Sequence, residues 1–190
     1  MRSLRLLVAL VTVILGTACT AGDSTPVTSA PVDMRAIADS APYLCKFVPE
    51  QAFRLVTGVS GPLRELADGT ERDGACRTPD TYPNPLGLGW ATTGDFDSVL
   101  EDKRKAYTEH GAVTLPADLG EGLAVYLPDG PLTGQPYEVV AKFRCGGKER
   151  LLTMFFAQVA QGRDGIRDMI ELMRIAQKRY GQLYTCTPGK

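Results

Sequence analysis

The chain has 190 residues and a formal net charge of −1 at pH 7, with 44% hydrophobic and 23% charged residues. These proportions are those of an ordinary globular protein, and the near-neutral charge excludes a protein that binds nucleic acid through bulk positive charge. The length suits one domain that follows an N-terminal segment of another kind.

Residues 1–18 have the order of segments that is typical of a secretory signal peptide. Arg2 and Arg5 precede an unbroken apolar stretch over 6–15, and small residues then lead into Cys19. The apolar stretch is shorter than the about 20 residues that a membrane-spanning helix needs. Small residues directly before a cysteine resemble the lipobox of bacterial lipoproteins, so we expect diacylglycerol on Cys19. A simple secretory signal, which leaves Cys19 without lipid, is the alternative.

Residues 19–42 comprise the lipid-anchor cysteine and a flexible tether. The stretch after Cys19 is rich in Thr, Ser, Ala, Pro and Asp and has no apolar period, which is typical of an unstructured linker. We therefore expect a protein anchored by lipid to the extracytoplasmic face of the cell membrane, with one folded domain over 43–187.

The cysteines of this domain predict disulfides. The chain has five cysteines, and a lipid on the first leaves an even set, which in an oxidising compartment indicates disulfide bonds. The four are Cys45, Cys76, Cys145 and Cys186. Because they form no Cys-x-x-Cys pair and the chain has a single histidine, we expect no metal site and no cofactor.

The domain begins with a short helix followed by strand-like pieces. Pro49 suits the first helical turn, because its missing N–H would be unpaired there, and Gly58 follows the last helical residue, Thr57. The apolar face of this helix consists of Ala52, Phe53 and Val56. Strand-like pieces follow at 63–66 and 75–78.

The stretch 86–93 is predicted to be a strand with one bulky and one bare face. The bulky face carries Leu86, Leu88, Trp90 and Thr92, and the bare face carries Gly87, Gly89 and Ala91. Asp95 can cap a second helix whose apolar spacing continues to Gly111, and 119–127 is the next predicted strand.

Two β-rich runs joined by Gly146 and Gly147 predict a hairpin. A two-residue turn pairs Cys145 with Lys148. This register places seven apolar residues on one face, and a slip of one residue would move them into water. These residues are Tyr137, Val139, Ala141, Phe143, Leu152, Met154 and Phe156.

The longest amphipathic helix runs from about Ile166 and is expected to end at Gly181. If it covers the core face of the hairpin, Cys186 comes back toward Cys145. We therefore favour the pairs Cys145–Cys186 and Cys45–Cys76, although spacing alone allows other connectivities. The predicted fold class is α+β: an antiparallel sheet of about five to seven strands packed by about three helices in one disulfide-stapled domain.

Several local patterns resemble those of a known family. They are Cys19 with the polar tether, Leu44-Cys45-Lys46-Phe47 leading into Pro49-Glu50, Ala75-Cys76-Arg77, and Leu119-Gly120-Glu121-Gly122-Leu123-Ala124. Together they resemble a family of actinobacterial envelope lipoproteins that is classed only as a domain of unknown function, over about residues 40 to 187. The resemblance implies no known reaction and no catalytic residues.

His110 is the only histidine, so any Ser-His-Asp or Cys-His catalytic group must use it. It lies at the predicted end of the second helix, where a histidine is a favourable cap on the helix dipole. Its neighbours one turn back, Ala106 and Tyr107, offer no carboxylate. We therefore expect no catalytic residues, with a wall-modifying hydrolase that depends on His110 as the alternative.

The bare strand face and the second face of the hairpin are the candidate groove. A glycine in a strand often marks the close approach of a ligand or of another backbone, and close packing by a helix explains it equally well. The groove candidates are Gly87, Gly89, Ala91, Val140, Leu151 and Phe155. We expect a non-enzymatic binding module for an apolar small molecule or for another envelope protein.

Overall fold

The computed structural model describes residues 35–79, 81–128 and 134–189. The predicted signal peptide, Cys19 and the tether as far as residue 34 lie outside the described residues. Within the described ranges, no helix combines the length and the hydropathy that a membrane span requires.

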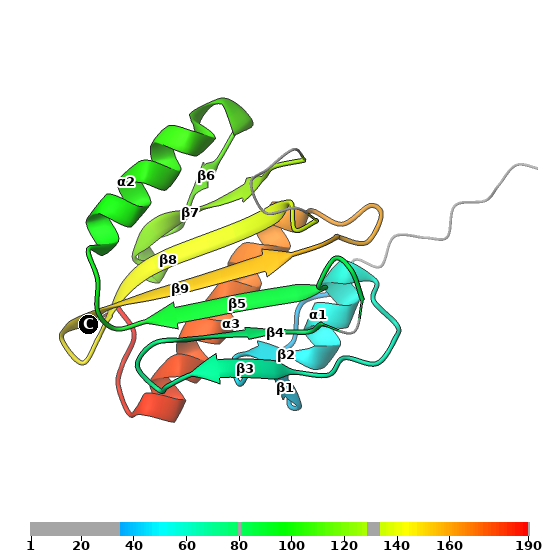
Figure 1. Ribbon diagram of the computed structural model, residues 1–190, viewed down its shortest axis with the longest axis horizontal. Coiled ribbons are helices and arrows are strands. Elements are labelled where there is room, and N and C mark those ends of the chain that lie inside the picture. Colours follow the sequence, from blue (N-terminus) through cyan, green and yellow to red (C-terminus); the bar gives the residue numbers. More distant parts are fainter. Residues whose placement is uncertain (1–34, 80, 129–133, 190) are drawn as a thin grey trace, which may run out of the picture. The chain divides into compact units, whose positions relative to one another are not determined.

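The domain is α+β, as predicted, with a seven-stranded antiparallel sheet and a small two-stranded sheet (Figure 1). In the large sheet the strand order is β3-β4-β5-β9-β8-β7-β6. Its strands are β3 (Leu66–Gly69), β4 (Gly74–Arg77), β5 (Leu86–Ala91), β6 (Val113–Thr114), β7 (Glu121–Tyr126), β8 (Tyr137–Cys145) and β9 (Lys148–Phe156). The small sheet and the α-helices are β1 (Tyr43–Leu44), β2 (Val48–Pro49), α1 (Glu50–Thr57), α2 (Phe96–Tyr107) and α3 (Gly165–Tyr184).

The hairpin of β8 and β9 has the predicted register. Cys145 lies opposite Lys148, and the pairing continues without interruption to Tyr137 opposite Phe156. Gly146 and Gly147 have φ values of 62° and 74°, the left-handed conformation that a tight hairpin turn of this kind requires. Of the seven predicted core residues, Tyr137 is half-buried and the other six are buried.

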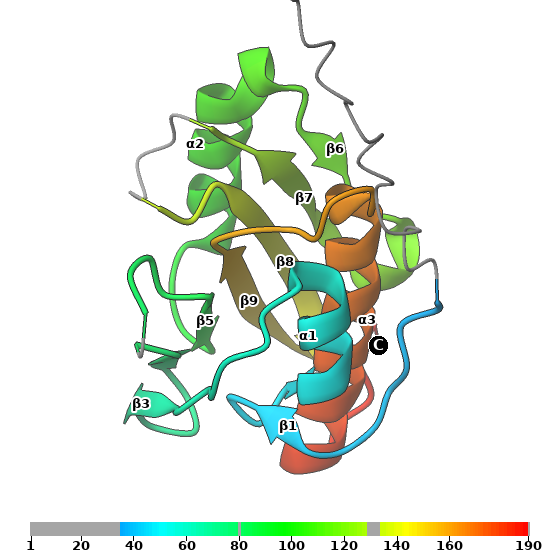
Figure 2. The same cartoon turned by 90° about the vertical axis from the view of Figure 1, so that its right-hand side faces the viewer.

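The core face of the sheet is covered by α1 and α3, and α2 lies on the opposite face (Figures 1 and 2). The side chains that α3 buries in the main core are Met169, Leu172, Met173, Ala176 and Tyr180. Burying a large apolar side chain contributes about 1.5–3 kcal/mol, so this helix supplies much of the driving force. The ring of Phe47 packs between those of Trp90 and Tyr180, at centroid distances of 5.7 and 6.0 Å.

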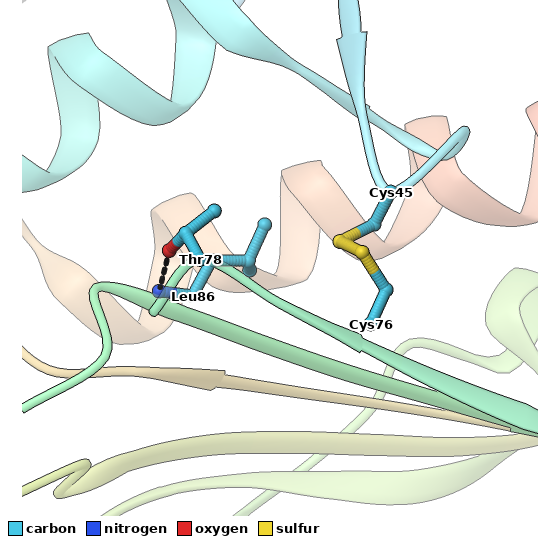
Figure 3. Close-up of a disulfide and its surroundings, with 4 residues drawn as sticks. All are labelled: Cys45, Cys76, Thr78 and Leu86. Carbon is cyan, nitrogen blue, oxygen red and sulfur yellow. Dashed lines mark hydrogen bonds between the residues drawn. A yellow bond between two sulfur atoms is a disulfide. The ribbon is translucent and has the colours of Figure 1, made fainter. Parts of the chain in front are cut away.

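Both predicted disulfides are confirmed. Cys45, in the turn between β1 and β2, is bonded to Cys76 of β4 (Figure 3), and Cys145 at the end of β8 is bonded to Cys186. The Cα–Cα distances are 5.6 and 5.3 Å, within the usual range for such bonds. One disulfide therefore fixes the outer part of the sheet, and the other fixes the chain after α3.

The predicted end of the last helix is wrong. The helix continues through Gly181 to Tyr184 and ends at Thr185, whose φ is 53°. A Cβ on Gly181 would lie 2.5 Å from the carbonyl oxygen of Cys186 and 2.7 Å from Cδ of Pro188. The glycine is therefore present because the C-terminal tail folds back against the helix, and it does not terminate the helix.

Several strand boundaries also differ from those predicted. The piece expected at 63–66 is β3 at 66–69, where a tight turn closed by the Thr70 N–H to Asp73 C=O hydrogen bond (2.8 Å) leads into β4. The strand expected at 119–127 is β7 at 121–126, and Leu119 is instead the last residue of a 3-10 helix (Ala117–Leu119). The strands β1, β2 and β6 were not predicted, because two residues are too few to show an alternating pattern.

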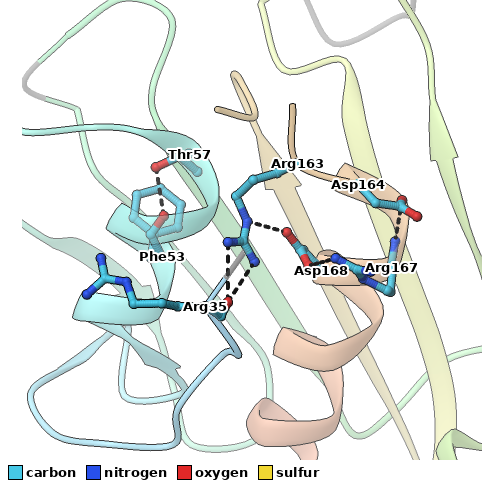
Figure 4. A network of polar contacts seen from close by, with 7 residues as sticks. All are labelled: Arg35, Phe53, Thr57, Arg163, Asp164, Arg167 and Asp168. Atoms are coloured by element: carbon cyan, nitrogen blue, oxygen red, sulfur yellow. Dashed lines mark hydrogen bonds and ion pairs between the residues drawn. The ribbon is translucent and has the colours of Figure 1, made fainter. Parts of the chain in front are cut away.

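Residues 35–42, which were expected to belong to the flexible tether, are fixed to the domain. Arg163 forms a buried ion pair with Asp168 at 2.5 Å, and its guanidinium also donates to the Arg35 carbonyl at 3.4 Å (Figure 4). Further along, Asp39 accepts hydrogen bonds from Lys178 on α3 (2.6 Å) and from the Tyr43 hydroxyl (2.8 Å). The ordered domain thus begins before residue 43.

Gly181→Ala tests the account of the C-terminal tail. Alanine normally stabilises a helix relative to glycine by about 0.5–1 kcal/mol, but here the added methyl group has no room. We expect the free energy of unfolding in urea to fall by about 1–3 kcal/mol, the usual cost of overpacking. Gly61→Ala, in a loop, is the control for the added methyl group, because no described atom outside residues 60–62 lies within 4 Å of its Cβ position. A Gly181→Ala protein as stable as the wild type would contradict this account.

Candidate functional site

The face of the large sheet that carries α2 is divided into a covered half and an open half. In the covered half, α2 packs on β7 and β8 through a second hydrophobic cluster. Its members are Leu100, Tyr107, Leu123, Val125, Leu127 and Val140, with Ala112 and Leu151 packed against it. Val140 is completely buried, so this residue and Leu151, both predicted to line a groove, belong to the packing beneath a helix.

Two groups of ion pairs hold α2 on the sheet. The Lys142 side chain is 8% exposed, and its ammonium pairs with Asp97 near the start of α2, with Glu121 (3.1 Å) and with Glu149 (3.7 Å). The hydrogen bond to Asp97, followed by the contacts with Glu121, raises the pKa of Lys142 above its ordinary value, although desolvation acts in the opposite direction. The first turn of α2 is thereby fixed to β7, β8 and β9.

The second group lies at the other end of α2. The Glu138 carboxylate is buried, forms an ion pair with Lys103, and accepts a hydrogen bond from the Tyr107 hydroxyl at 2.7 Å. Burial and this hydrogen bond raise the pKa of Tyr107 well above its ordinary value. Both ends of the helix are therefore held to the sheet, and this half of the face is closed.

The open half lies over β3, β4, β5 and the adjoining part of β9. The strand register places Leu66, Arg77, Gly87 and Phe155 side by side in one row across these strands, and Asp68, Ala75, Gly89 and Thr153 in the next row. Directly opposite residues in antiparallel strands project from the same face. A cavity of about 590 Å³ lies over these two rows, and we call it the open groove.

The floor of the open groove is made of small residues, and its edges carry larger ones. Ala75, Gly87 and Gly89 form the floor. The residues at the edges are Leu66, Asp68, Arg77, Asn84, Gln135 and Phe155. Pockets that bind small molecules are mostly apolar with a few polar groups at fixed positions, and the open groove has this character.

The two floor glycines differ in what lies above them. A Cβ on Gly87 would lie 3.2 Å from Oε1 and 3.3 Å from Nε2 of Gln135, whose amide donates to the Asn84 carbonyl at 2.8 Å. Over Gly89, the nearest atom to a Cβ is the Gly74 carbonyl oxygen at 3.9 Å. Close packing thus explains Gly87, whereas nothing in the described part of the chain fills the space above Gly89.

The structure brings together three of the six predicted groove residues, Gly87, Gly89 and Phe155, while Ala91 is half-buried further along β5. Sequence reasoning missed Leu66, Arg77 and Gln135. Leu66 and Arg77 reach the groove through the pairing of β3 with β4. The sequences of these two strands have no apolar alternation, so their register could not be predicted. Gln135 lies in the loop before β8, and no sequence pattern indicated that it lines a groove.

A second cavity of about 400 Å³ lies among three loops at the end of the sheet, and we call it the loop cavity. Its lining includes Pro62, Leu63, Pro83, Pro85 and Ala157. These loops are held by their own contacts: the buried Thr78 hydroxyl accepts the Leu86 N–H (Figure 3), and the amide of Gln158 donates to the Thr57 carbonyl. Because these contacts keep the loops in place, the loop cavity is a second place where a small molecule could bind. A binding experiment must therefore distinguish it from the open groove.

Possible metal ligands come together at the first disulfide. Within the described residues, the ligand atoms of Cys45, Glu65 and Cys76 lie within 4.8 Å of one another. Thiolate is the form of cysteine that binds metal, and the two sulfur atoms are bonded to each other. In this oxidised form the group is a disulfide beside a carboxylate and offers no thiolate.

His110 lies at an exposed helix end, in the 3-10 turn that follows α2 and directly before Gly111. Its side chain has no hydrogen bond or ion pair with any described residue, and it lines neither the open groove nor the loop cavity. A catalytic imidazole needs a nucleophile within about 3 Å and a group that orients its second nitrogen. The hydrolase alternative therefore receives no support from the surroundings of His110.

Comparison of the chain with protein-family models, curated proteins and solved structures found no match. The resemblance to the actinobacterial lipoprotein family stays a prediction.

Lys142→Met tests the ion pairs that hold α2. Because the folded-state pKa of Lys142 lies above its ordinary 10.5, its ion pairs stabilise the folded state fully below that pH, and this stabilisation is lost as the pH rises through the folded-state pKa. We expect the Tm of the wild type minus that of the variant to be constant from about pH 7 to 9 and to decrease above about pH 10.5.

The pH dependence is the decisive measurement, because replacing a buried charge by an apolar side chain can have either sign at neutral pH. The titrations of other groups are common to both proteins and cancel in the difference. A difference that stays constant to about pH 11.5 would show that Lys142 is not held by these carboxylates.

Proposed function

We propose that the protein is a lipid-anchored binding module of the cell envelope that holds a small apolar or amphiphilic molecule in the open groove and carries out no reaction on it. The observation that carries this proposal is the space above Gly89, which no residue in the described part of the chain fills. Glycine inside a strand destabilises the fold by about 0.5–1 kcal/mol relative to alanine, and a β-branched residue would suit the position better still. Glycine at this position therefore makes the fold less stable, and its lack of a side chain keeps the groove deep.

The dimensions of the open groove favour a small molecule. Its volume of about 590 Å³ lies within the range of about 300–1,000 Å³ for small-molecule pockets. The edge side chains Leu66 and Phe155 supply apolar walls, and Leu66 is 48% exposed. A molecule between these walls would remove apolar surface from water, which is the main driving force for such binding.

The N-terminal sequence supports the location. The signal-like segment and the small residues before Cys19 favour a lipid anchor, and two acyl chains hold a protein on a bilayer where one chain binds only marginally. Neither of the two disulfides would persist in a reducing cytosol. The anchor would keep the open groove near a membrane, which is a source of amphiphilic molecules.

Cys19→Ser tests the anchor. We expect the wild-type chain to carry diacylglycerol and to fractionate with membranes of its host, and the variant to be released or to remain unprocessed. Intact-mass measurement and fractionation check both outcomes. If the variant stays in the membrane fraction at the normal mature mass, the lipid anchor is refuted and the groove remains to be tested separately.

Gly89→Val tests the open groove with the uncharged fluorescent probe N-phenyl-1-naphthylamine. We expect residues 20–190, which contain the whole described domain, to bind the probe with increased fluorescence. In the variant the valine side chain fills the space above the floor, so the Kd should rise at least about tenfold, which corresponds to about 1.4 kcal/mol. Tm should not fall, because the nearest described atom to the new Cβ outside residues 88–90 is the Gly74 carbonyl oxygen at 3.9 Å.

Two control variants locate the probe. Leu63→Ala changes the loop cavity and His110→Ala changes the histidine that a hydrolase would need, and both should bind the probe like the wild type. Unchanged binding by Gly89→Val would place the probe elsewhere and refute the groove, and so would a loss of binding in Leu63→Ala alone. Absence of binding by the wild type would also count against a small apolar ligand and favour an envelope protein as the partner.

A further inference from the structure

We infer that the ligand of the open groove carries an anionic group beside its apolar part, and that Arg77 binds this group. The inference rests on the proposed function and specifies the chemical class of the ligand: a flat apolar ring system that bears a carboxylate, sulfonate or phosphate. Its basis is the position of Arg77 in the sheet together with the distribution of polar groups around the groove.

Arg77 lies in the row that crosses the groove. It is directly opposite Leu66 on one side and Gly87 on the other. Cβ atoms of directly opposite residues in antiparallel strands lie about 4.5–5.5 Å apart, so the arginine side chain leaves the sheet beside the glycine floor. Its long aliphatic part can line the groove while the guanidinium reaches the rim.

The guanidinium of Arg77 has no hydrogen bond or ion pair with any described residue. Lys142, another cation on this face, is surrounded by three carboxylates. Arg77 therefore differs from the cation that holds α2, because its five N–H donors remain available to a ligand. A guanidinium binds a planar carboxylate or a phosphate through two parallel hydrogen bonds.

The remaining polar groups give the groove a direction. Asn84 and Gln135 lie at the same end as Arg77, next to the loop between β4 and β5, and both have amide groups that can donate. Asp68 lies one row further along, beside Ala75, and one of its carboxylate oxygens accepts the Gly69 N–H at 2.7 Å. An anion is therefore favoured at the Arg77 end and disfavoured at the Asp68 end.

The size of the floor favours a flat ring system. Neighbouring strands lie about 4.8 Å apart, so Leu66 on β3 and Phe155 on β9 are separated by about 14 Å across three strand spacings. Gly87 and Gly89 are about 7 Å apart along β5. Because Gln135 and Phe155 lie close above Gly87, the open part of this area lies over Gly89 and Ala75, where a flat ring system can pack with its edge or face against the ring of Phe155.

Two probes of nearly the same shape test the inference. N-phenyl-1-naphthylamine is uncharged, and 1-anilinonaphthalene-8-sulfonate is the same ring system with a sulfonate. We expect Arg77→Gln to raise the Kd of the sulfonate about tenfold, as loss of a hydrogen bond to a charged group does, and to change the Kd of the uncharged probe less than about twofold. Arg77→Lys should recover part of the affinity for the sulfonate.

Arg72→Gln is the matched control for net charge, because Arg72 lies in the turn between β3 and β4 outside the groove. At about 0.15 M salt its charge is largely screened, so affinity for the sulfonate should be unchanged. Equal losses in Arg77→Gln and Arg72→Gln would overturn the inference, and so would equal losses for both probes. No loss in Arg77→Gln, with binding of the uncharged probe still blocked by Gly89→Val, would overturn it while leaving the proposed function intact.

A further experiment distinguishes a soluble amphiphile from a membrane surface as the source of the anionic group that Arg77 binds. Sedimentation of the unlipidated chain with phosphatidylglycerol vesicles should show no binding that depends on Arg77. Sedimentation that Arg77→Gln abolishes would assign the arginine to lipid headgroups and overturn the inference.

Discussion

The two-residue turn at Gly146 and Gly147 sets the register of β8 against β9, and both faces of the sheet depend on that register. With Cys145 opposite Lys148, apolar side chains from the two strands meet on the face beneath α1 and α3. The same alternation sends Glu138, Val140 and Lys142 to the other face. A slip of one residue would bury charges under α3 and expose the core, so the register is strongly determined.

Glu138 and Lys142 then decide how far α2 can extend over the second face. Each lies on β8 and is paired with a side chain of α2, so the helix is centred over β7 and β8 and ends short of β5. Buried ion pairs contribute little net stability, because desolvation offsets much of their attraction, but one that loses its partner is strongly destabilising. They therefore determine where the helix lies, and the open groove exists because the helix lies there.

Features that depend on short stretches of sequence could be predicted, and features that depend on the arrangement of distant elements could not. The hairpin, the caps at Asp95 and Gly58, and the pairing of the cysteines depend on short patterns or on one docking step, and the structure confirms them. The division of the second face could not be predicted. Val140 and Phe155 have the same alternation and similar hydrophobicity, and only the three-dimensional position of α2 places the first in a core and the second at a groove.

The sequence likewise does not show why a glycine occurs inside a helix or strand. Gly181 and Gly89 both interrupt a regular element, and a sequence offers the same interpretations for each: an end, a close approach or a ligand. The tail contacts Gly181, whereas none of the described residues fills the space above Gly89, and this difference distinguishes the two. A glycine becomes evidence for function only after packing has failed to explain it.

The outer wall of the groove depends on contacts that lie behind it. All four residues of β3 are exposed, and in β4 only Cys76 is buried, so these strands gain little from hydrophobic packing. Two contacts on the core side hold them: the disulfide from Cys76 to Cys45, and the hydrogen bond from the Trp90 indole to the Thr70 carbonyl at 2.9 Å. Because β4 also carries Arg77, the disulfide fixes the cationic edge of the groove without occupying it. The disulfide thus gives this edge of the sheet a rigidity that the few buried apolar residues of β3 and β4 would not supply.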